Sequence, residues 1–371
     1  MRHRHGLVIG KFYPPHAGHH HLIDTAAAAC ERLTVICAAA SVESIPPADR
    51  VAWLRETHPQ PSVEIVPVVD DIEIDYASDA IWSAHVEVFR AGLASLSGLG
   101  VDVPAVDAVF SSEEYGAELA RRFSAVHVPV DPPRDRFPVS GSAVRADPVA
   151  CWQWLSPPVR GYLARRVVVV GAESSGTTTL ARALAAHYAA AGGPWAATRW
   201  VPEYGRTYCE EKLSAARRAD PALWIGDLPW SSGEFTLIAE RQLALEDAAA
   251  RSGSPLLICD TDALATAIWH ERYLDAPAPS VERVHERAPH ALWILTDTAG
   301  VPFEQDGWRD GESIREWMSG RFRAELSRRG LPHLVVTGSH DDRMAAATGA
   351  IAALIDAGWD FTEPLRPPVH H

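Results

Sequence analysis

The stretch Gly6–Leu22 constrains the fold of the first half of the chain more than any other segment. Its apolar run Leu7–Ile9 predicts a buried strand, and Gly10 allows a sharp turn directly after it. From Pro14 onward the residues follow a helical pattern. A buried strand that turns at once into a helix is typical of a parallel, helix-flanked sheet, whose ligands bind at the carboxyl ends of the strands.

Two histidines, His16 and His19, stand three residues apart at the start of that helix. A helix N-terminus attracts phosphates through its backbone N–H groups and its dipole, and two imidazoles add hydrogen-bonding capacity there. A lone histidine in such a turn is more often structural. Here both histidines belong to one spaced set, which favours a phosphate site: Gly10, Phe12, Pro14, His16, Gly18 and His19.

This set resembles the G-x-F-x-P-x-H-x-G-H signature of the nucleotidylyltransferases. The resemblance implies that both histidines bind the phosphates of ATP and stabilise the charge that develops at the α-phosphate. It also implies a Rossmann-like α/β nucleotidylyltransferase domain, which we place at residues 1–163. The nucleotide site of this domain is then expected to contain Gly10, Lys11, Phe12 and Gly18.

Length and composition limit the other possibilities. The chain has 371 residues, enough for two domains, and a formal net charge of −14 without a long run of Lys or Arg. These values argue against a nucleic-acid or anionic-membrane partner. The five cysteines form no C-x-x-C pair, and we find no signal peptide or membrane span, so we expect a cytoplasmic protein. Although there are 17 histidines, no cysteine stands at metal-ligand spacing, and we expect no zinc site.

Further strands alternate with helical segments through the first half. Apolar runs predict strands at 33–38, 63–69, 106–110 and 125–130. This alternation predicts a parallel sheet with helices on its faces. Asp70 and Asp71 follow one of these strands at its carboxyl end, where such sheets place ligand contacts.

The segment from Asp71 through Trp82 and His85 resembles the D…W-x-x-H-V segment of nicotinamide mononucleotide adenylyltransferases. The resemblance implies that Trp82 stacks on the nicotinamide ring, since an indole face suits a flat cationic pyridinium. It makes Asp71, Trp82 and His85 substrate-binding residues. The alternative is that Trp82 and His85, three apart on a helix, are ordinary core or rim residues.

The segment Val139–Arg145 resembles the I-S-x-T-x-x-R element of the same enzymes, with Val for Ile and Ser142 for Thr. Ser140 and Ser142 can cap a helix and turn backbone N–H groups toward a triphosphate, while Arg145 adds a fixed positive charge. Alone, these residues would be a helix cap and a surface arginine. Together with the two histidines they give the predicted catalytic set of this domain: His16, His19 and Arg145.

A second strand–turn–helix unit begins near residue 165. The apolar run Val167–Val170 precedes Gly-Ala-Glu-Ser-Ser-Gly-Thr-Thr, and an alanine-rich helix then runs to about Ala191. This segment resembles a P-loop, G-x-x-x-x-G-K-[ST], except that Thr177 stands at the lysine position. The backbone can still form a phosphate nest, and Thr178 can still bind Mg²⁺. We assign to the nucleotide site Gly171, Ser174, Ser175, Gly176, Thr177, Thr178 and Thr179, in a P-loop kinase α/β domain at 164–360.

Later segments add candidate residues for this second domain. The buried strand 256–259 ends in Asp260 and Asp262, a Walker-B-like position for a Mg²⁺ ligand and a contact to a substrate hydroxyl. Arg309, in an Asp-Gly-Trp-Arg loop, is the cation that we expect to offset the missing lysine. The assignments are Asp260 and Arg309 for catalysis, Thr178 and Asp260 for the metal, and Glu203, Tyr204, Arg206 and Asp262 for the substrate.

Taken together, the two halves resemble the NadR family of bifunctional nicotinamide-nucleotide adenylyltransferases and ribosylnicotinamide kinases, over residues 6–358. The resemblance implies that the second domain phosphorylates nicotinamide riboside with ATP and Mg²⁺. The first domain then adenylylates the mononucleotide to NAD and releases pyrophosphate. Members that repress transcription carry an N-terminal helix-turn-helix, which we do not expect before a strand that begins at Gly6. We expect small-molecule partners, leave a homo-oligomer open, and expect a disordered tail at 361–371.

Two alternatives stay open on the sequence. Because Thr177 replaces the lysine, the second domain can be an inactive or nucleotide-sensing kinase beside a working transferase. The chain can also be a regulatory binding protein that reports NAD or ATP levels, although a sensor would not need the set His16, His19 and Arg145. Fold analogy also allows a related first-domain substrate such as pantetheine phosphate. The segment from Trp82 to His85 and the attached kinase pattern favour nicotinamide.

Overall fold

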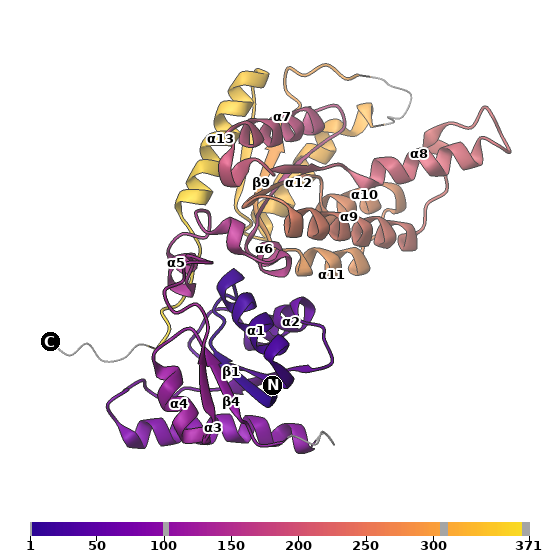
Figure 1. Ribbon diagram of the computed structural model, residues 1–371. Coiled ribbons are helices and arrows are strands. Elements are labelled where there is room, and N and C mark those ends of the chain that lie inside the picture. Colours follow the sequence, from indigo (N-terminus) through magenta and orange to yellow (C-terminus); the bar gives the residue numbers. More distant parts are fainter. Residues whose placement is uncertain (1, 99–103, 305–310, 366–371) are drawn as a thin grey trace. The chain divides into compact units, whose positions relative to one another are not determined.

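The computed structural model describes residues 2–98, 104–304 and 311–365, which divide into two compact units (Figure 1). The first unit comprises Met1–Val159 together with the C-terminal segment from Trp359. The second comprises Arg160–Gly358. Each unit contains one five-stranded sheet, and all strand pairs in both sheets are parallel. The α/β class predicted from the alternating pattern is confirmed.

The sheet of the first unit has the order β3-β2-β1-β4-β5. Its central strand β1 contains the buried apolar residues Leu7–Ile9, and Leu7 lies between Thr34 of β2 and Val109 of β4. The order reverses beside β1, and ligands of doubly wound sheets bind at such a reversal, beyond the carboxyl ends of the strands. The strands are β1 (His3–Gly10), β2 (Cys30–Ala39), β3 (Val63–Val69), β4 (Ala108–Ser111) and β5 (Val126–Pro129).

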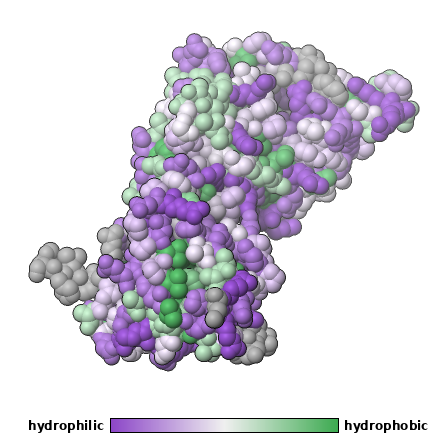
Figure 2. Space-filling view, viewed as in Figure 1, coloured by the Kyte–Doolittle hydropathy of each residue, from purple (hydrophilic) through white to green (hydrophobic). Residues whose placement is uncertain are grey.

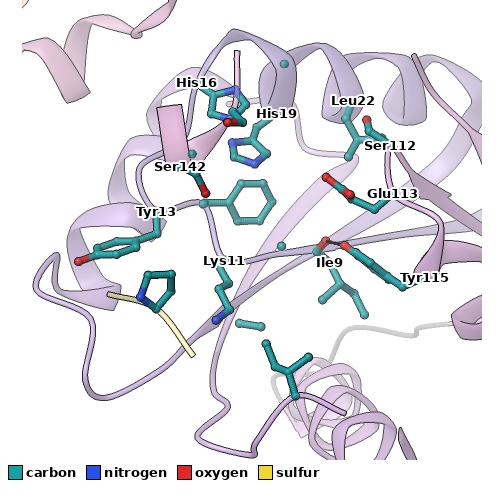
Figure 3. A pocket seen from close by; sticks show the side chains of 18 of the residues that line it. Ile9, Lys11, Tyr13, His16, His19, Leu22, Ser112, Glu113, Tyr115 and Ser142 are labelled. Carbon is teal, nitrogen blue, oxygen red and sulfur yellow. Dashed lines mark hydrogen bonds between the residues drawn. The ribbon is translucent and has the colours of Figure 1, made fainter. Parts of the chain in front are cut away.

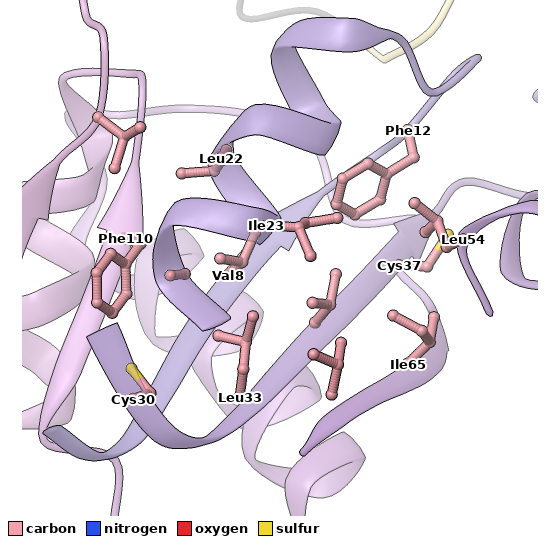
Figure 4. Packing of buried hydrophobic residues seen from close by; sticks show 14 of the residues in the cluster. Val8, Phe12, Leu22, Ile23, Cys30, Leu33, Cys37, Leu54, Ile65 and Phe110 are labelled. Atoms are coloured by element: carbon pink, nitrogen blue, oxygen red, sulfur yellow. The ribbon is translucent and has the colours of Figure 1, made fainter. Parts of the chain in front are cut away.

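Helices cover both faces of this sheet. On one face, Leu22 and Ile23 of α1 pack against Val8 and Leu33 (Figure 4). On the other face, Phe89 of α3 packs in the cluster that contains Leu7 and Ile9 of β1. The alternation of side chains along β1 therefore supplies two cores, as in a strand buried on both sides. The helices are α1 (Ala17–Ala29), α2 (Pro47–Thr57), α3 (Asp79–Gly98), α4 (Tyr115–Phe123) and α5 (Gly141–Ala146), with the short helices Trp152–Trp154 and Pro157–Leu163 after them.

The second unit has the strand order β10-β9-β6-β8-β7. Helices α7 and α13 cover one face, where Leu184 and Ile351 pack against Val167 and Ile294. The strands are β6 (Arg165–Gly171), β7 (Arg199–Val201), β8 (Leu256–Asp260), β9 (His290–Thr296) and β10 (His333–Val336). The helices are α7 (Thr177–Ala190), α8 (Tyr204–Ala216), α9 (Ser232–Ser252), α10 (Ala263–Leu274), α11 (Pro279–Arg287), α12 (Arg315–Arg328) and α13 (His340–Asp356), with three-residue helical turns at Gly193–Trp195, Ile225–Asp227 and Glu312–Ile314.

The prediction of a disordered tail is wrong for residues 361–365, which pack on the first unit. The carbonyl of Thr362 accepts a hydrogen bond from the Tyr13 hydroxyl at 3.0 Å, and its N–H donates to Ser44 Oγ at 3.2 Å. The ring of Phe361 meets that of Tyr13 edge to face at 6.1 Å. The proline-rich composition suggested disorder, but one aromatic ring and two backbone hydrogen bonds anchor the segment. The rest of the predicted tail, 366–371, lies outside the described residues.

The visible surface of each unit mixes polar and apolar side chains (Figure 2). Within the described ranges, no helix is long and apolar enough to cross a membrane. Cys30, Cys37 and Cys259 are buried, where a free cysteine behaves as a small apolar core residue.

Candidate functional sites

A cavity of about 530 Å³ opens in the first unit beside the carboxyl end of β1 (Figure 3). Residues far apart in the sequence meet there: the turn after β1, the start of α1, α3 and the start of α5. The predicted residues that line it are Gly10, Lys11, Phe12, His16, Gly18, His19, Trp82, His85, Ser140, Ser142 and Arg145.

His16 and His19 form a stacked pair in this cavity, with ring centroids 3.8 Å apart and an interplanar angle of 28°. Their Nδ1 atoms are buried, and neither has a hydrogen-bond partner among the residues that the structure describes. Burial, helped by the nearby His20 and Arg134, lowers the pKa of His16 to about 3. Burial also lowers the pKa of His19 well below its usual range. In the absence of an anion, both imidazoles are therefore neutral near pH 7.

Arg145 connects the start of α5 to the turn after β1. Its Nη1 donates to the Tyr13 carbonyl at 2.6 Å, and its Nη2 donates to Ser142 Oγ at 3.2 Å. Ser140 caps α5, since its Oγ accepts from the N–H of Ala143 at 3.1 Å. The predicted cap is confirmed. It holds Arg145 and the first N–H groups of α5 at the cavity wall.

Lys11 also reaches into the cavity, where burial lowers its pKa from the usual value. Its Nζ lies 3.5 Å from Glu43 Oε1 and donates to the Leu365 carbonyl at 3.1 Å. Figure 3 shows the yellow C-terminal segment beside Lys11 and Tyr13. Leu365 itself lines the cavity, so the C-terminal segment forms part of the wall.

The structure corrects one aspartate assignment: Asp70 lines the cavity and Asp71 does not. Asp70 Oδ2 lies 2.7 Å from His85 Nδ1, and this hydrogen bond raises the pKa of His85. Asp71 accepts hydrogen bonds from the N–H and Oγ of Ser41, at 2.6 and 2.7 Å. The two side chains diverge because neighbours in extended chain point to opposite sides.

Trp82 lies at the boundary between the first cavity and the core. It lines the cavity and also packs against the core cluster beside α3. Its Nε1 donates to the Tyr76 carbonyl at 3.1 Å, and the Arg122 guanidinium lies 5.5 Å from its ring centroid. The indole is thus fixed at the cavity wall next to Tyr76, which is another lining residue.

Sequence reasoning missed several lining residues of the first cavity. Arg134 forms an ion pair with Glu113. Tyr115 donates from its hydroxyl to the Ile9 carbonyl at 3.2 Å and so braces the end of β1. Tyr13 lies between Phe12 and Pro14 at an unspecified position of the spaced set, and for Arg134 the single available signal was an arginine among prolines and aspartates. The missed residues are Tyr13, Tyr115, Arg134 and Phe137.

A second, smaller cavity of about 150 Å³ lies in the second unit at the carboxyl ends of β6 and β8. The glycine-rich turn between β6 and α7 forms one wall. A Cβ on Gly171 would come within 2.2 Å of Thr296 Oγ1, and Gly176 has a φ of +90°, so both glycines are required by the turn. The predicted residues that line this cavity are Gly171, Ser174, Thr177, Thr178, Glu203, Arg206 and Asp260.

Three of the assigned P-loop residues do not line the cavity. Ser175 is buried beneath the turn, where its Oγ donates to the Ala172 carbonyl and contacts Thr296 Oγ1, both at 2.6 Å. Gly176 supplies the left-handed turn, and Thr179 is an exposed residue of the first turn of α7. The structure therefore gives Ser175 and Gly176 conformational roles in the turn.

Two acids face the second cavity beside Thr178. Asp260 is 3 % exposed, and burial raises its pKa to about 6 against the opposing effect of a hydrogen bond from Thr178. Burial, followed by the charge of Asp260, raises the pKa of Glu203 to about 8. Arg206 lies nearby and donates from Nε to Glu210 at 3.1 Å. A hydroxyl and a carboxylate thus meet where a P-loop protein binds its metal.

Asp262 is fully buried and does not line the cavity, contrary to the substrate assignment. Its Oδ1 caps α10 by accepting from the N–H of Ala265 at 2.9 Å, and its Oδ2 accepts from Trp293 Nε1 at 2.8 Å. Alternation along a strand would place Asp260 and Asp262 on one side. Thr261, with a φ of +81°, breaks that alternation and turns the chain into the helix.

Tyr204 does not line the cavity, and its N–H donates to Gln242 Oε1 at 2.9 Å, which fixes the start of α8. Arg309 lies outside the described residues. The residues that sequence reasoning missed form an aromatic wall opposite the P-loop, for which the scattered positions gave no periodic signal: Trp230, Phe235, Trp269 and Tyr273.

Two buried or half-buried arginines hold the glycine-rich turn from outside. Arg343 Nη1 donates to the Ser175 carbonyl at 2.7 Å. Arg315 donates from Nη2 to the Ser174 carbonyl and from Nε to the Glu173 carbonyl, both at 3.1 Å. Three successive carbonyls of the turn are thus fixed by guanidinium groups, which also place two positive charges beside it.

Comparisons with known proteins agree with this two-part architecture. A family model described as an AAA domain matches residues 166–343. The trifunctional NAD biosynthesis/regulator protein NadR of Escherichia coli K12 is 26 % identical over 326 residues, which cover 83 % of this chain and 72 % of that protein. The protein of the same name from Salmonella typhimurium LT2 is 26 % identical over 325 residues, with the same coverage.

Two solved structures share the fold over nearly the full length. A NadR protein in complex with NR superposes with a TM-score of 0.73 at 18 % identity, covering 98 % of this chain and 99 % of that one. A NadR protein in complex with NAD and AMP-PNP gives a TM-score of 0.67 at 17 % identity and the same coverage.

Proposed function

Because the chain is homologous to NadR, we propose that it is an enzyme of NAD synthesis with two activities, one in each unit. The second unit phosphorylates nicotinamide riboside with ATP. The first unit joins the resulting mononucleotide to the AMP moiety of a second ATP. The names of the relatives, and the NR, NAD and AMP-PNP bound in the two similar structures, support this choice of substrates.

The observation that carries the first activity is the buried pair His16 and His19 at the start of α1. Both residues line the cavity, and their Nδ1 atoms have no hydrogen-bond partner in the part of the chain that the structure describes. Adenylyl transfer forms a bond from a mononucleotide phosphate oxygen to the α-phosphorus of ATP and breaks the bond to pyrophosphate, which leaves with the electron pair. Neutral imidazoles that gain a proton or donate N–H at this phosphorus stabilise the developing charge. Arg145 and the N–H groups of α5 then bind the departing pyrophosphate.

The mononucleotide itself needs a site for a flat cationic ring. Trp82 and Tyr76 provide aromatic surface at the cavity wall. Asp70 supplies a negative charge there, and its Oδ2 is hydrogen-bonded to His85 Nδ1. We expect the ring to lie against Trp82 and the mononucleotide phosphate to point toward His16.

For the second activity, Thr178 and Asp260 offer a hydroxyl and a carboxylate, the donor set that suits Mg²⁺ in a P-loop. Bound there, Mg²⁺ would neutralise charge on the ATP phosphates. Glu203 lies beside Asp260 with its pKa raised to about 8, and its ionised fraction can accept the proton of the riboside hydroxyl as the hydroxyl oxygen takes the γ-phosphoryl group. The aromatic wall of Trp230, Phe235, Trp269 and Tyr273 suits the pyridinium of the riboside.

One observation favours a second candidate for this unit. Thr177 stands at the lysine position and lines the cavity, so the turn contributes no lysine to the β/γ-phosphates. In this candidate the unit binds ATP and reports its level without transferring phosphate.

One incubation tests both activities and the alternative. The purified full chain is incubated with ATP and Mg²⁺, and with nicotinamide riboside, its mononucleotide or pantetheine phosphate, and products are separated by chromatography. We expect NAD from both nicotinamide compounds and no product from pantetheine phosphate. NAD from the mononucleotide alone, with ATP binding in the second unit shown by calorimetry, supports the sensing candidate. Absence of NAD from the mononucleotide contradicts the proposed first activity.

A further inference from the structure

A cluster of titratable side chains lies in the second unit away from both cavities. It joins Glu246 of α9, Asp262 at the N-cap of α10, His285 of α11 and His290 at the start of β9. None of these four lines the second cavity. The side chains of Glu246, Asp262 and His290 are at most 1 % exposed, and that of His285 is 10 % exposed.

The hydrogen bonds of His290 define which of its nitrogens is protonated. Its Nε2 lies 2.7 Å from Glu246 Oε2, a distance that requires a proton on Nε2. In the neutral ring, Nδ1 then carries a lone pair. That Nδ1 is buried, lies 3.7 Å from Asp262 Oδ2, and makes no hydrogen bond with any part of the chain that the structure describes.

His285 repeats this arrangement from another helix. Its Nδ1 is also buried, without a hydrogen-bond partner in the described ranges, and lies 3.9 Å from the same oxygen of Asp262. The three ligand-type atoms, Asp262 Oδ2 and the two Nδ1 atoms, all lie within 4.8 Å of one another. Asp262 Oδ2 already accepts a hydrogen bond from Trp293 Nε1 at 2.8 Å, so its remaining lone pair points to the same buried space as the two nitrogen lone pairs. Buried nitrogen lone pairs without a donor cost desolvation free energy unless a cation joins them.

The charge of the surroundings gives the sign and size of that cation. The nearby Arg166 pairs with Asp247, with 2.7 Å between Nη2 and Oδ1, and its Nη1 lies 3.9 Å from Glu246 Oε2. One guanidinium thus faces three carboxylates, and the charges of Glu246 and Asp262 raise the pKa of His290 against the effect of burial. A divalent ion would balance the two remaining negative charges and take the place of a proton on His290.

We propose that Asp262, His285 and His290 bind a divalent transition metal, with Zn²⁺ as the ion that their donor set favours. Two imidazole nitrogens and one carboxylate oxygen are common zinc ligands. A tetrahedral ion with bonds of about 2.1 Å separates its ligand atoms by roughly 3.4 Å, so the observed 3.7 and 3.9 Å need to shorten by a few tenths of an ångström. Glu246 plays the part of the carboxylate that orients a metal-bound histidine through its other nitrogen.

The sequence argued against zinc because no cysteine stands at ligand spacing. The fold supplies the ligands instead from a helix cap, a second helix and a strand. A metal here would join α10, α11 and β9 behind the strand that carries Asp260. It would act on the stability of the second unit and would leave the first unit unaffected.

The test measures metal in the full chain, purified without metal-affinity chromatography and dialysed against a zinc-limited buffer after loading with Zn²⁺. Elemental analysis of the wild type should give one tightly held equivalent. His285→Gln and His290→Gln should each lose it, with more than tenfold weaker zinc binding by competition with a chromophoric chelator. His270→Gln is the matched control, because His270 is equally buried in the same unit but both its nitrogens are hydrogen-bonded. His58→Gln tests for zinc on the His20–His58 pair of the first unit. Both controls should retain the equivalent.

A measurement on the wild type keeps the test decisive if a variant does not fold. X-ray absorption at the zinc edge should show a first shell of nitrogen and oxygen with imidazole scattering and no sulfur. Sulfur in that shell would assign the ion to Cys259 with Glu246 and His290 and would overturn the ligand set. A wild type that retains no zinc, or variants that keep as much as the wild type, would overturn the proposal and leave His290 as a protonated imidazolium between two carboxylates.

Discussion

The stacked imidazoles of His16 and His19, 3.8 Å apart between ring centroids, lie buried at the start of α1 with unpartnered nitrogens among the described residues. Each neutral ring can take up a proton when a phosphate binds beside it. Before that, a buried neutral ring carries no charge, so it adds little desolvation cost to the folded state. Each neutral ring keeps one N–H that can donate a hydrogen bond to a phosphate oxygen.

The first prediction concerns stability against pH. His16 has a folded-state pKa of about 3 and an ordinary pKa of about 6.5 when unfolded. The unfolded chain therefore binds the extra proton between these values, and folding stability falls as pH falls below 6.5. Between pH 8 and 5.5 this residue should remove about 1.4 kcal/mol from the unfolding free energy. His16→Asn should lose that pH dependence in urea unfolding of the full chain, and an unchanged dependence contradicts the buried neutral state.

A second prediction separates the two adjacent aspartates. Asp70→Asn removes the partner of His85 and should lower the pKa of that histidine, as read by NMR titration. The loss of a charge-assisted hydrogen bond, about 1.5–3 kcal/mol, should weaken mononucleotide use by roughly ten- to a hundredfold in kcat/KM. Asp71→Asn is the control and should stay within about twofold, because Asp71 bonds to Ser41 away from the cavity. Equal effects would remove Asp70 from the site.

Trp82 offers a third prediction. Trp82→Ala should raise KM for the mononucleotide far more than KM for ATP, since stacking on a pyridinium affects one substrate. Leu96→Ala is a suitable comparison, because Leu96 packs in the same core cluster on the same helix but does not line the cavity. If both variants change the two KM values alike, Trp82 is a packing residue.

The fourth prediction concerns the missing lysine. Thr177→Lys should leave riboside phosphorylation unchanged or raise it mildly, because Thr178 and the backbone of the turn remain. Arg309→Ala should lower kinase kcat by about two or more decades, in the range of arginine-finger losses. Steady-state kinetics of riboside phosphorylation by both variants would measure these two effects. A large gain from Thr177→Lys, with no loss from Arg309→Ala, would mean that no other cation offsets the lysine.

The fold and the first cavity could largely be predicted from local patterns. Apolar strand–glycine–helix sequences fix how a chain turns, so the positions of His16, His19 and Thr178 followed from neighbours within a few residues. The Ser140 cap was readable for the same reason. These features depend on backbone chemistry that a short segment contains.

The rest depended on long-range contacts. Alternation in extended chain decides that Asp70, and not Asp71, faces the first cavity. One backbone torsion, at Thr261, decides that Asp260, and not Asp262, faces the second cavity. The contact of Leu365 with Lys11 joins residues 354 positions apart. The cluster around His290 takes ligands from separate elements, and no spacing in the sequence brings them together.

The central claim is that one chain holds two independent activities, and a paired assay tests it most directly. NAD formation from the mononucleotide and phosphorylation of the riboside are measured on the same preparations of wild type, His19→Ala and Asp260→Asn. His19→Ala should lower adenylyl transfer by about 10²–10³-fold and leave riboside phosphorylation within about twofold of wild type. Asp260→Asn should show the reverse pattern. Loss of both activities together in folded His19→Ala protein would contradict the account.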